Sequence, residues 1–310
     1  MYSFSTCWNS HRHSDGRAML REIRELGFEY AELSHGIKLS LVPGILDAVD
    51  TGEIKISSLH NFCPLPMGVT HAAPNVYEFS DDDPRERELA IKHTQKTLEF
   101  ATRVKARAVV LHLGSIEAKD YTGKLAGMVT NQGSKKFETL QKEALRALAA
   151  KKEKFFVRTK EALRRILPEA ESRAITLGCE NRQALEELPI DGDFNEFLDE
   201  FKSPVAYWHD TGHAQIKENL GIIKHTSFLQ TLAPRLAGFH IHDVIFPARD
   251  HMTPGTGTID FAALKSFVSA RHIKVFELSP SLPATSIQAG VALIKNLWGE
   301  EPSAVEKIDG

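Results

Sequence analysis

Six short apolar runs of the sequence end in a histidine or a carboxylate, the side chains that bind metals and move protons. In "HDTGHA" (209–214), which follows the apolar run "VAYW", Asp210 and His213 stand three positions apart. The other runs end similarly, within "LHNFC" (59–63), "VVLHLG" (109–114), "LGCEN" (177–181), "GFHIHD" (238–243) and "FELSP" (276–280). Imidazole and carboxylate together can ligate a divalent metal or act as general acid and base. The chemistry therefore depends on whether the fold brings these run ends together.

The runs belong to a regular alternation of short β-like segments with longer helical ones. Alternation of this kind predicts parallel strand pairing, and eight units close into a (β/α)₈ TIM barrel. We therefore expect an α/β fold with a single domain over residues 1–310. A doubly wound open sheet is the alternative, but no glycine-rich phosphate loop follows the first strand. The expected strands are Tyr2–Cys7, Tyr30–Leu33, Ile56–His60, Ala108–His112, Thr176–Glu180, Val205–Asp210, Ala237–His242 and Lys274–Leu278.

Helical spacing is clearest over 15–28, which ends at Gly27, over 85–106, and over 154–174, where Pro168 predicts an interruption or kink. Residues 114–153 do not fit the alternation and are expected to form a helical insert after the fourth strand. The basic residues within 134–154 can attract phosphate or a polynucleotide, but a solvated helical face with glutamate partners at 138, 143 and 153 is the favoured interpretation.

On a barrel, the carboxyl ends of all strands meet at one mouth, where the active site lies. Strands three to eight would therefore direct six potential metal ligands to this mouth: His60, His112, Glu180, Asp210, His240 and Glu277. We expect one divalent ion, among Mn²⁺, Zn²⁺, Co²⁺ and Mg²⁺, held by the last four residues. His60 and His112 are candidates for a second ion or for contacts with substrate. A structural network of ion pairs is the alternative interpretation of the same residues.

The order of these motifs resembles that of the xylose isomerase-like TIM barrels, a superfamily that includes sugar phosphate isomerases/epimerases and AP endonucleases of the second structural family. The resemblance covers nearly the whole chain. It rests on "HLGS" (112–115), "CEN" (179–181), "DTGH" (210–213), "HIHD" (240–243) and "H…PGTG" (251–257). "ELSHG", "LHNFCPLP" and "YWHDTGHAQ" look like the bacterial sugar phosphate isomerase/epimerase type.

The sugar branch of this family implies one metal and two catalytic glutamates, here Glu180 and Glu277. These would move a proton next to a carbonyl through an enediolate, in an isomerisation or epimerisation of a sugar or sugar phosphate. His213 would contact substrate hydroxyls. Independently of the resemblance, Arg249 and His251 lie in a loop beyond the seventh strand and are expected to bind a phosphate or carboxylate group of the substrate. A keto-sugar dehydratase or lyase would use the same metal and base, so this alternative stays open.

The endonuclease branch implies three metals and phosphodiester hydrolysis. His60 and His112 would hold one metal, bridged to the second by Glu180, and His213 and His251 would hold the third. That third metal also takes an aspartate two residues before the last histidine, where this chain has Arg249. A guanidinium is always charged and cannot be a ligand, so the departure counts against the three-metal centre.

The composition is that of an ordinary globular chain without a basic excess. Of 310 residues, 42% are hydrophobic and 25% charged, with a net charge of −3, which makes nucleic acid an unlikely partner. Three scattered cysteines, no apolar leader segment and no long apolar run predict a cytoplasmic protein without a membrane span. The oligomeric state cannot be read from the sequence.

The remaining ionisable residues near the strand ends receive weaker predictions. His209 should point away from Asp210, toward the helix layer, and Glu32 toward either the mouth or a helix. His242 shares the face of His240 and is expected either to hold a residue of the site from behind or only to support Asp243. Three further histidines are expected at the surface: His93, His225 and His272.

Overall fold

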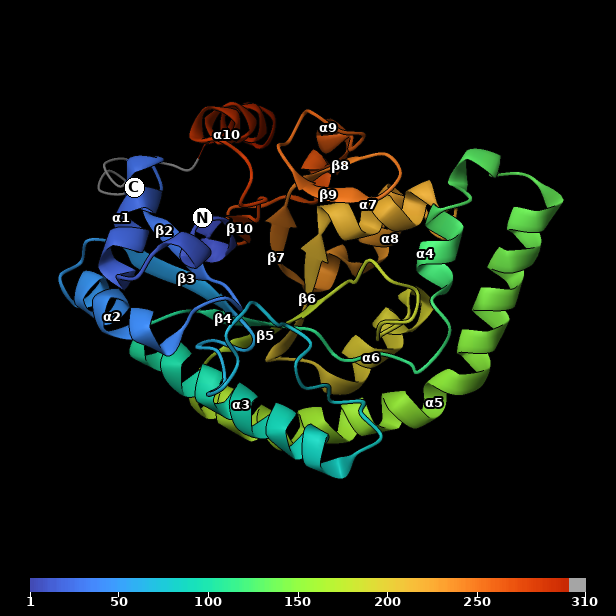
Figure 1. Ribbon diagram of the computed structural model, residues 1–310, viewed down its shortest axis with the longest axis horizontal. Helices are drawn as coiled ribbons and strands as arrows, with labels where there is room; N and C mark the ends of the chain where they lie inside the picture. Colours follow the sequence, from blue (N-terminus) through green and yellow to red (C-terminus); the bar gives the residue numbers. More distant parts are fainter. Residues whose placement is uncertain (301–310) are drawn as a thin grey trace.

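The computed structural model describes residues 1–300, so the last ten residues of the expected domain lie outside the described part of the chain. Eight parallel strands close into a barrel in which neighbouring strands follow one another in the sequence (Figure 1). The predicted (β/α)₈ fold is confirmed, and the strand bounds differ from the predicted ones by at most two residues. The strands are β1 (Tyr2–Ser5), β2 (Tyr30–Leu33), β3 (Lys55–His60), β4 (Ala108–Leu111), β5 (Thr176–Glu180), β6 (Val205–Asp210), β7 (Leu236–Ile241) and β10 (Ile273–Phe276).

The barrel interior beneath the mouth is filled around Trp208. Its indole is fully buried and packs with small and branched side chains of other strands across the barrel, among them Val110 of β4 and Val275 of β10. Gly178 and Gly238 face the indole so closely that a Cβ atom would lie 2.9 Å and 2.5 Å from it. Side chains alternate between the two faces of a strand, so the inward residues two positions later reach the mouth. The packed indole therefore forms a floor below the strand ends.

Helices surround the barrel and follow its strands in sequence (Figure 1). The first begins at an aspartate N-cap, Asp15, which accepts a hydrogen bond from the amide of Ala18, and it buries Met19, Leu20 and Ile23. A short antiparallel pair, β8 (Asp243–Ile245) and β9 (Arg249–Met252), follows β7. The α-helices are α1 (Gly16–Glu25), α2 (Val42–Asp50), α3 (Pro84–Arg103), α4 (Tyr121–Ala126), α5 (Lys135–Ser172), α6 (Phe194–Phe201), α7 (Thr211–Asn219), α8 (His225–Leu232), α9 (Phe261–Leu264) and α10 (Ala284–Trp298).

The segment after β4 differs from its prediction. The expected insert, 114–153, and the expected helix, 154–174, share one continuous helix, α5, because no turn residue separates their helical patterns. Pro168 lies inside this helix and does not end it; its missing N–H costs one backbone hydrogen bond close to the C-terminus. Figure 1 shows α5 changing direction near its middle, between the arm beside α4 and the part beneath α3.

Several basic residues of α5 are paired with carboxylates from other elements. Lys152 lies 2.6 Å from Asp193, and Lys154 lies 2.7 Å from Asp82. These partners come from outside the insert, not from the glutamates expected at 138, 143 and 153. The pairing leaves less free positive charge for a phosphate or a polynucleotide than the sequence of α5 alone indicates.

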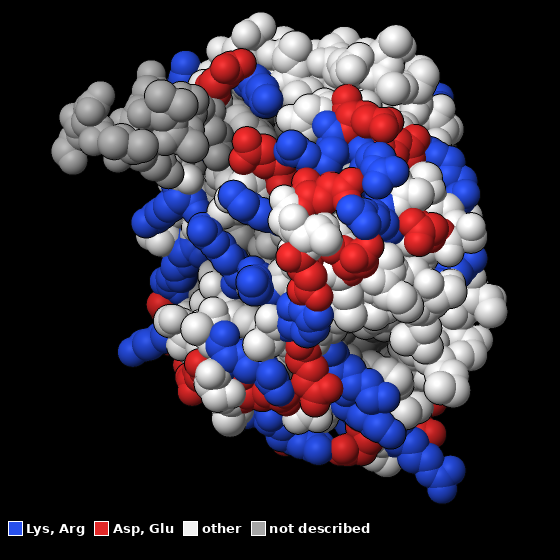
Figure 2. All heavy atoms as spheres, turned by 90° about the vertical axis from the view of Figure 1, so that its left-hand side faces the viewer, with Lys and Arg blue, Asp and Glu red and all other residues white. Residues whose placement is uncertain are grey.

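Charges of both signs are also interspersed over α1 and α2, on the side of the molecule seen in Figure 2. Arg17 lies 2.7 Å from Asp47 and 2.6 Å from Glu53, and Arg103 lies 2.6 Å from Asp50. A strand of nucleic acid would require a continuous basic surface, which this face does not offer. Within residues 1–300, no helix combines the length and apolar character needed to cross a bilayer.

Candidate metal centre

The ends of β5, β6, β7 and β10 bring four predicted ligands together above the Trp208 floor. We call Glu180, Asp210, His240 and Glu277 the metal quartet; one donor atom from each lies within 4.8 Å of all the others. Nδ1 of His240 is 2.6 Å from Oε1 of Glu180, 3.1 Å from Oε2 of Glu277 and 3.9 Å from Oδ2 of Asp210. All four side chains are buried. The sequence therefore predicted a set of residues that the fold does assemble.

The tautomer of His240 is set by Glu32, whose orientation the sequence had left open. Glu32 is fully buried at the end of β2, and its carboxylate lies 3.2 Å from Nε2 of His240. The hydroxyl of Ser58 donates a hydrogen bond of 2.7 Å to Oε2 of Glu32 and holds the carboxylate in place. With its Nε2–H directed at Glu32, His240 presents Nδ1 to the other three members of the quartet. Carboxylates commonly orient metal-binding histidines in this way.

Asp210 is held by two donors that leave it facing the quartet. It caps α7 by accepting a 2.7 Å hydrogen bond from the amide of His213, and it lies 3.0 Å from Nε2 of His242. Nδ1 of His242 accepts a 2.9 Å hydrogen bond from the amide of His251, so the proton of a neutral His242 ring sits on Nε2 and points at Asp210. Gly212 makes room for this ring, since a Cβ there would collide with it. His242 thus supports Asp210, one of the roles expected for it.

The quartet is strongly negative, which suits a cation. Burial disfavours charge on Glu180, but Arg182 and His240 overcome it and hold the pKa of Glu180 well below its usual range. Burial alone would lower the pKa of His240, yet Glu277, Glu32 and Glu180 together raise it well above the ordinary value. A divalent ion would satisfy the same negative field. The mixed oxygen and nitrogen donors fit Mn²⁺, Zn²⁺ or Co²⁺.

His60 and His112 lie on the opposite side of Glu180. Nδ1 of His60 donates to the carbonyl of Asn61 at 3.0 Å, and Nδ1 of His112 donates to the amide oxygen of Asn75 at 2.6 Å. Both Nε2 lone pairs therefore face the mouth, 3.8 Å and 2.9 Å from Oε2 of Glu180. Nε2 of His112 is buried and has no partner in hydrogen-bonding geometry among the described residues. A cation or a substrate hydroxyl would supply that partner.

Arg182 is a site residue that sequence reasoning missed. Its Nη1 donates a 2.8 Å hydrogen bond to Oε2 of Glu180, and its Nε donates a 3.0 Å hydrogen bond to Glu187. Burial opposes the charge on Glu187, but Arg182 overcomes it and lowers the pKa of Glu187 to about 2. The arginine follows "CEN" directly in the sequence, so its nearness to Glu180 was visible, although the direction of its side chain was not.

The third group of predicted residues lies at the outer edge of the mouth. Nδ1 of His213 lies 3.5 Å from Oδ2 of Asp210 and 3.0 Å from the carbonyl of Asn181. Burial would lower the pKa of His251, but Asp250, at 3.3 Å, and Glu277 raise it to about 9. Arg249 is exposed, in contrast to its neighbour Asp250. The carboxylate beside His251 thus comes from position 250, not from position 249.

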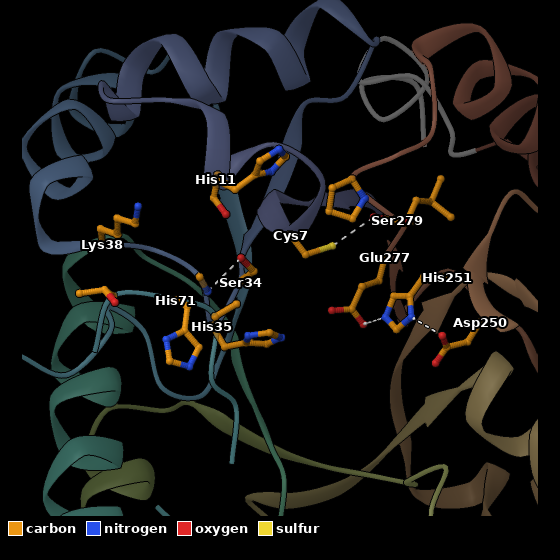
Figure 3. A pocket seen from close by; sticks show the side chains of 16 residues that line it. Cys7, His11, Ser34, His35, Lys38, His71, Asp250, His251, Glu277 and Ser279 are labelled. Carbon is orange, nitrogen blue, oxygen red and sulfur yellow. Dashed lines mark hydrogen bonds and ion pairs between the residues drawn. The ribbon is translucent and has the colours of Figure 1, made fainter. Parts of the chain in front are cut away.

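The mouth opens into a cavity of about 590 Å³ (Figure 3). Glu277, His251 and Asp250 line one side, and His35 and His71 line the other. Nδ1 of His35 is buried and has no hydrogen-bond partner among the described residues. Arg249 is not one of the described residues that line the cavity. His35 was not predicted, although it lies in the quoted motif "ELSHG" at the end of a strand.

Three histidines outside the mouth were predicted at the surface, and two of these predictions are wrong. His225 and His272 are buried, because α8 and β10 pack them against neighbouring elements, and His93 is half-buried. Nε2 of His225 lies 2.9 Å from Nε2 of His209, which confirms that His209 points toward the helix layer.

Comparison with known proteins places the whole chain in one structural group. A D-tagatose 3-epimerase-like protein superposes with a TM-score of 0.66 at 15% identity, covering 96% of each chain. A 3-keto-D-glucoside 4-epimerase from E. coli gives 0.67 at 15% identity, covering 95% of this chain and 98% of that one. D-psicose 3-epimerase from Clostridium cellulolyticum H10 gives 0.66 at 13% identity, covering 96% and 99%. No curated protein sequence matches the chain.

At such low identity these structures establish only the fold. The model of the xylose isomerase-like TIM barrel family, however, matches residues 20–297, which include every member of the metal quartet. The chain belongs to the xylose isomerase-like TIM barrel family.

Proposed function

We propose that this protein is a divalent-metal-dependent sugar isomerase or epimerase that transfers a proton next to a carbonyl. The observation that carries the proposal is the position of Glu277, which is at once a member of the metal quartet and a wall of the cavity. A carboxylate in this position can contact a bound substrate and also ligate the ion. The names of the three superposed epimerases support the same class of reaction.

The residues of the mouth divide the chemistry between them. A divalent ion held by the quartet supplies electrophilic stabilisation of the negative charge that develops on the substrate oxygens. Glu277 removes or returns the proton on the carbon next to the carbonyl, and Glu180 is proposed to serve the opposite face. General acid–base catalysis of this kind contributes typically about 10²–10⁴-fold. His251, whose pKa is raised to about 9 by Asp250 and Glu277, is proposed to donate a hydrogen bond to a substrate oxygen.

The substrate class follows from the cavity. Its lining combines the carboxylate of Glu277 with the imidazoles of His35 and His251, which are suited to the hydroxyls of a polyol. We propose that His213 and Arg249 also contribute to substrate binding, with Arg249 reaching a substituent at the cavity's outer edge. A sugar or sugar phosphate is the substrate that fits these groups best.

The test is exchange of solvent deuterium into the substrate. The protein, loaded with Mn²⁺, is incubated in D₂O with a panel of free ketoses, phosphorylated ketoses and keto-glycosides. We expect one class to gain deuterium at a single carbon and to yield the epimer or isomer. Glu277→Gln should abolish the exchange, whereas the matched surface variant Glu53→Gln should retain it.

The two alternatives give different results in the same experiment. A dehydratase or lyase would form an unsaturated product and water or a second fragment. A phosphodiester hydrolase would cleave a duplex with an abasic site, and robust cleavage without any deuterium exchange would overturn the proposal.

A further inference from the structure

The two oxygens of the Glu180 carboxylate face different surroundings. Oε1 lies 2.6 Å from His240 and belongs to the metal quartet. Oε2 points the other way, 2.9 Å from Nε2 of His112 and 3.8 Å from Nε2 of His60. Donor atoms of Glu180, His60 and His112 lie within 4.8 Å of one another, close enough to hold a second ion bridged by this carboxylate. Whether a second ion binds therefore depends on what else Oε2 contacts.

Arg182 already occupies Oε2. Its Nη1 donates a 2.8 Å hydrogen bond to this oxygen, and a guanidinium keeps its charge at any physiological pH. The side chain is buried and held from behind, because its Nε donates to Oε1 of Glu187 at 3.0 Å. Oε2 of Glu187 in turn accepts a 3.1 Å hydrogen bond from the amide of Ala184. Hydrogen bonds within the loop that carries Arg182 thus hold the guanidinium against Glu180.

We propose that Arg182 restricts the centre to a single divalent ion by taking the carboxylate oxygen that would otherwise bridge to a second one. The proposal rests on the metal-dependent function proposed above. An ion bound to Oε2 at the usual distance of roughly 2.0–2.2 Å would lie within about 5 Å of Nη1. Repulsion between a divalent ion and a fixed cation at that distance is strong in a buried site, where water screens charge weakly.

The same arrangement gives His60 and His112 a different task. Their Nδ1 atoms donate to Asn61 and Asn75, so in the neutral rings the Nε2 atoms are acceptors. Without a second ion, the available donors at this side of the mouth are substrate hydroxyls. Arg182 therefore leaves these two histidines to bind substrate and leaves the ion to the quartet alone.

The experiment counts ions without relying on activity. The metal-free protein is titrated with Mn²⁺ and followed by native mass spectrometry and electron paramagnetic resonance. Wild type should bind one ion and give the spectrum of an isolated Mn²⁺. Arg182→Met/Glu187→Gln, which removes the guanidinium without leaving Glu187 as an unpaired carboxylate, should bind a second ion at least tenfold more tightly than wild type and show two coupled ions. The matched control Glu187→Gln keeps Arg182 and should still bind one.

Each other outcome has a definite meaning. Two ions in wild type, or a folded double variant that still binds only one, would overturn the proposal. No ion in wild type would instead overturn the metal-dependent function itself. His112→Gln tests the proposal in a wild-type background: it should leave the ion count at one and its affinity within about threefold while KM rises, and loss of an ion would contradict the assignment.

Discussion

Two neighbouring residues at the end of β6 belong to two histidine-rich regions with opposite properties. Asp210 faces the mouth and joins the metal quartet, whereas His209 faces the helix layer and contacts His225 of α8. Both regions are buried and both contain imidazoles within hydrogen-bonding distance of other polar groups. The difference between them lies in the charge of the groups that surround the imidazoles.

In the mouth, carboxylates surround the histidines. Burial alone would lower the pKa of His240, but Glu277, Glu32 and Glu180 overcome this effect and raise it. In the helix layer the partners are neutral: the hydroxyl of Tyr207 lies 2.7 Å from Nδ1 of His209, and Gln215 lies 3.3 Å from His225. Burial there lowers the pKa of His225 to about 4. The same residue type thus lies in a strongly anionic cluster in one region and in neutral packing in the other.

The largest expected effect comes from removing a negative charge from the mouth. Asp210→Asn should weaken Mn²⁺ binding by roughly 100-fold or more and lower the exchange rate by about 10³-fold, because the quartet loses an anionic ligand. Titration with Mn²⁺ and deuterium exchange measure these changes. His209→Gln, one residue away, should keep the Mn²⁺ affinity within about threefold, yet lower the free energy of unfolding by about 1–3 kcal/mol because it disrupts buried hydrogen bonds. Equal effects of the two variants on metal binding would erase the distinction between the regions.

A smaller effect is expected where the support of the mouth is disturbed. In Gly212→Ala the new Cβ collides with the ring of His242, which must move away from Asp210. Overpacking of this kind costs about 1–3 kcal/mol of stability, and loss of a residue that orients a metal ligand typically costs about 10–100-fold in metal affinity or activity. Thermal unfolding and Mn²⁺ titration give the two quantities. An unchanged metal affinity would show that His242 does not position Asp210.

The strands and the metal quartet were readable from the sequence for a geometric reason. Residues two apart share a face of a strand, and all strands of a barrel end at one mouth. The side chain of an acid or histidine at the end of an apolar run, such as Glu180 or His240, is therefore directed to the mouth. This rule needs no knowledge of side-chain partners.

The residues that escaped prediction are those whose place depends on tertiary partners. Arg182 follows a strand, and only its hydrogen bonds to Glu180 and Glu187 direct it into the centre. Glu32 finds its role through His240, which lies 208 positions further along the chain. His225 looks like a surface residue because it begins a short helix, but it is buried and contacts His209 and Gln215. Local sequence does not contain these contacts.

In the helix layer around His209, the buried His225 makes the free energy of unfolding depend on pH. The pKa of His225 is about 4 in the folded protein, below its ordinary value near 6.5, so the unfolded chain binds more protons between these values. Stability from this group is therefore lost as pH falls through that window, by about 2 kcal/mol between pH 7 and pH 5. Between pH 7 and pH 5, the free energy of unfolding of wild type should fall by about 2 kcal/mol more than that of His225→Gln. Denaturant unfolding of both proteins at both pH values measures this difference. An identical pH dependence in the two proteins would mean that His225 is not held neutral by burial.

The smallest effect is expected outside both regions, at Arg249. This side chain is exposed on β9, lies outside the cavity lining, and is separated from the quartet by the pair of Asp250 and His251. Arg249→Ala should change the free energy of unfolding by no more than about 0.5 kcal/mol, since it removes no buried contact. If the substrate carries an anionic group at the cavity's outer edge, KM should rise by roughly two- to fivefold, the equivalent of an exposed charge pair, with kcat unchanged. The measurement is a comparison of KM for a phosphorylated ketose and its free counterpart: a rise for the phosphorylated sugar alone assigns Arg249 to anion binding, and equal KM values before and after the substitution remove it from the site.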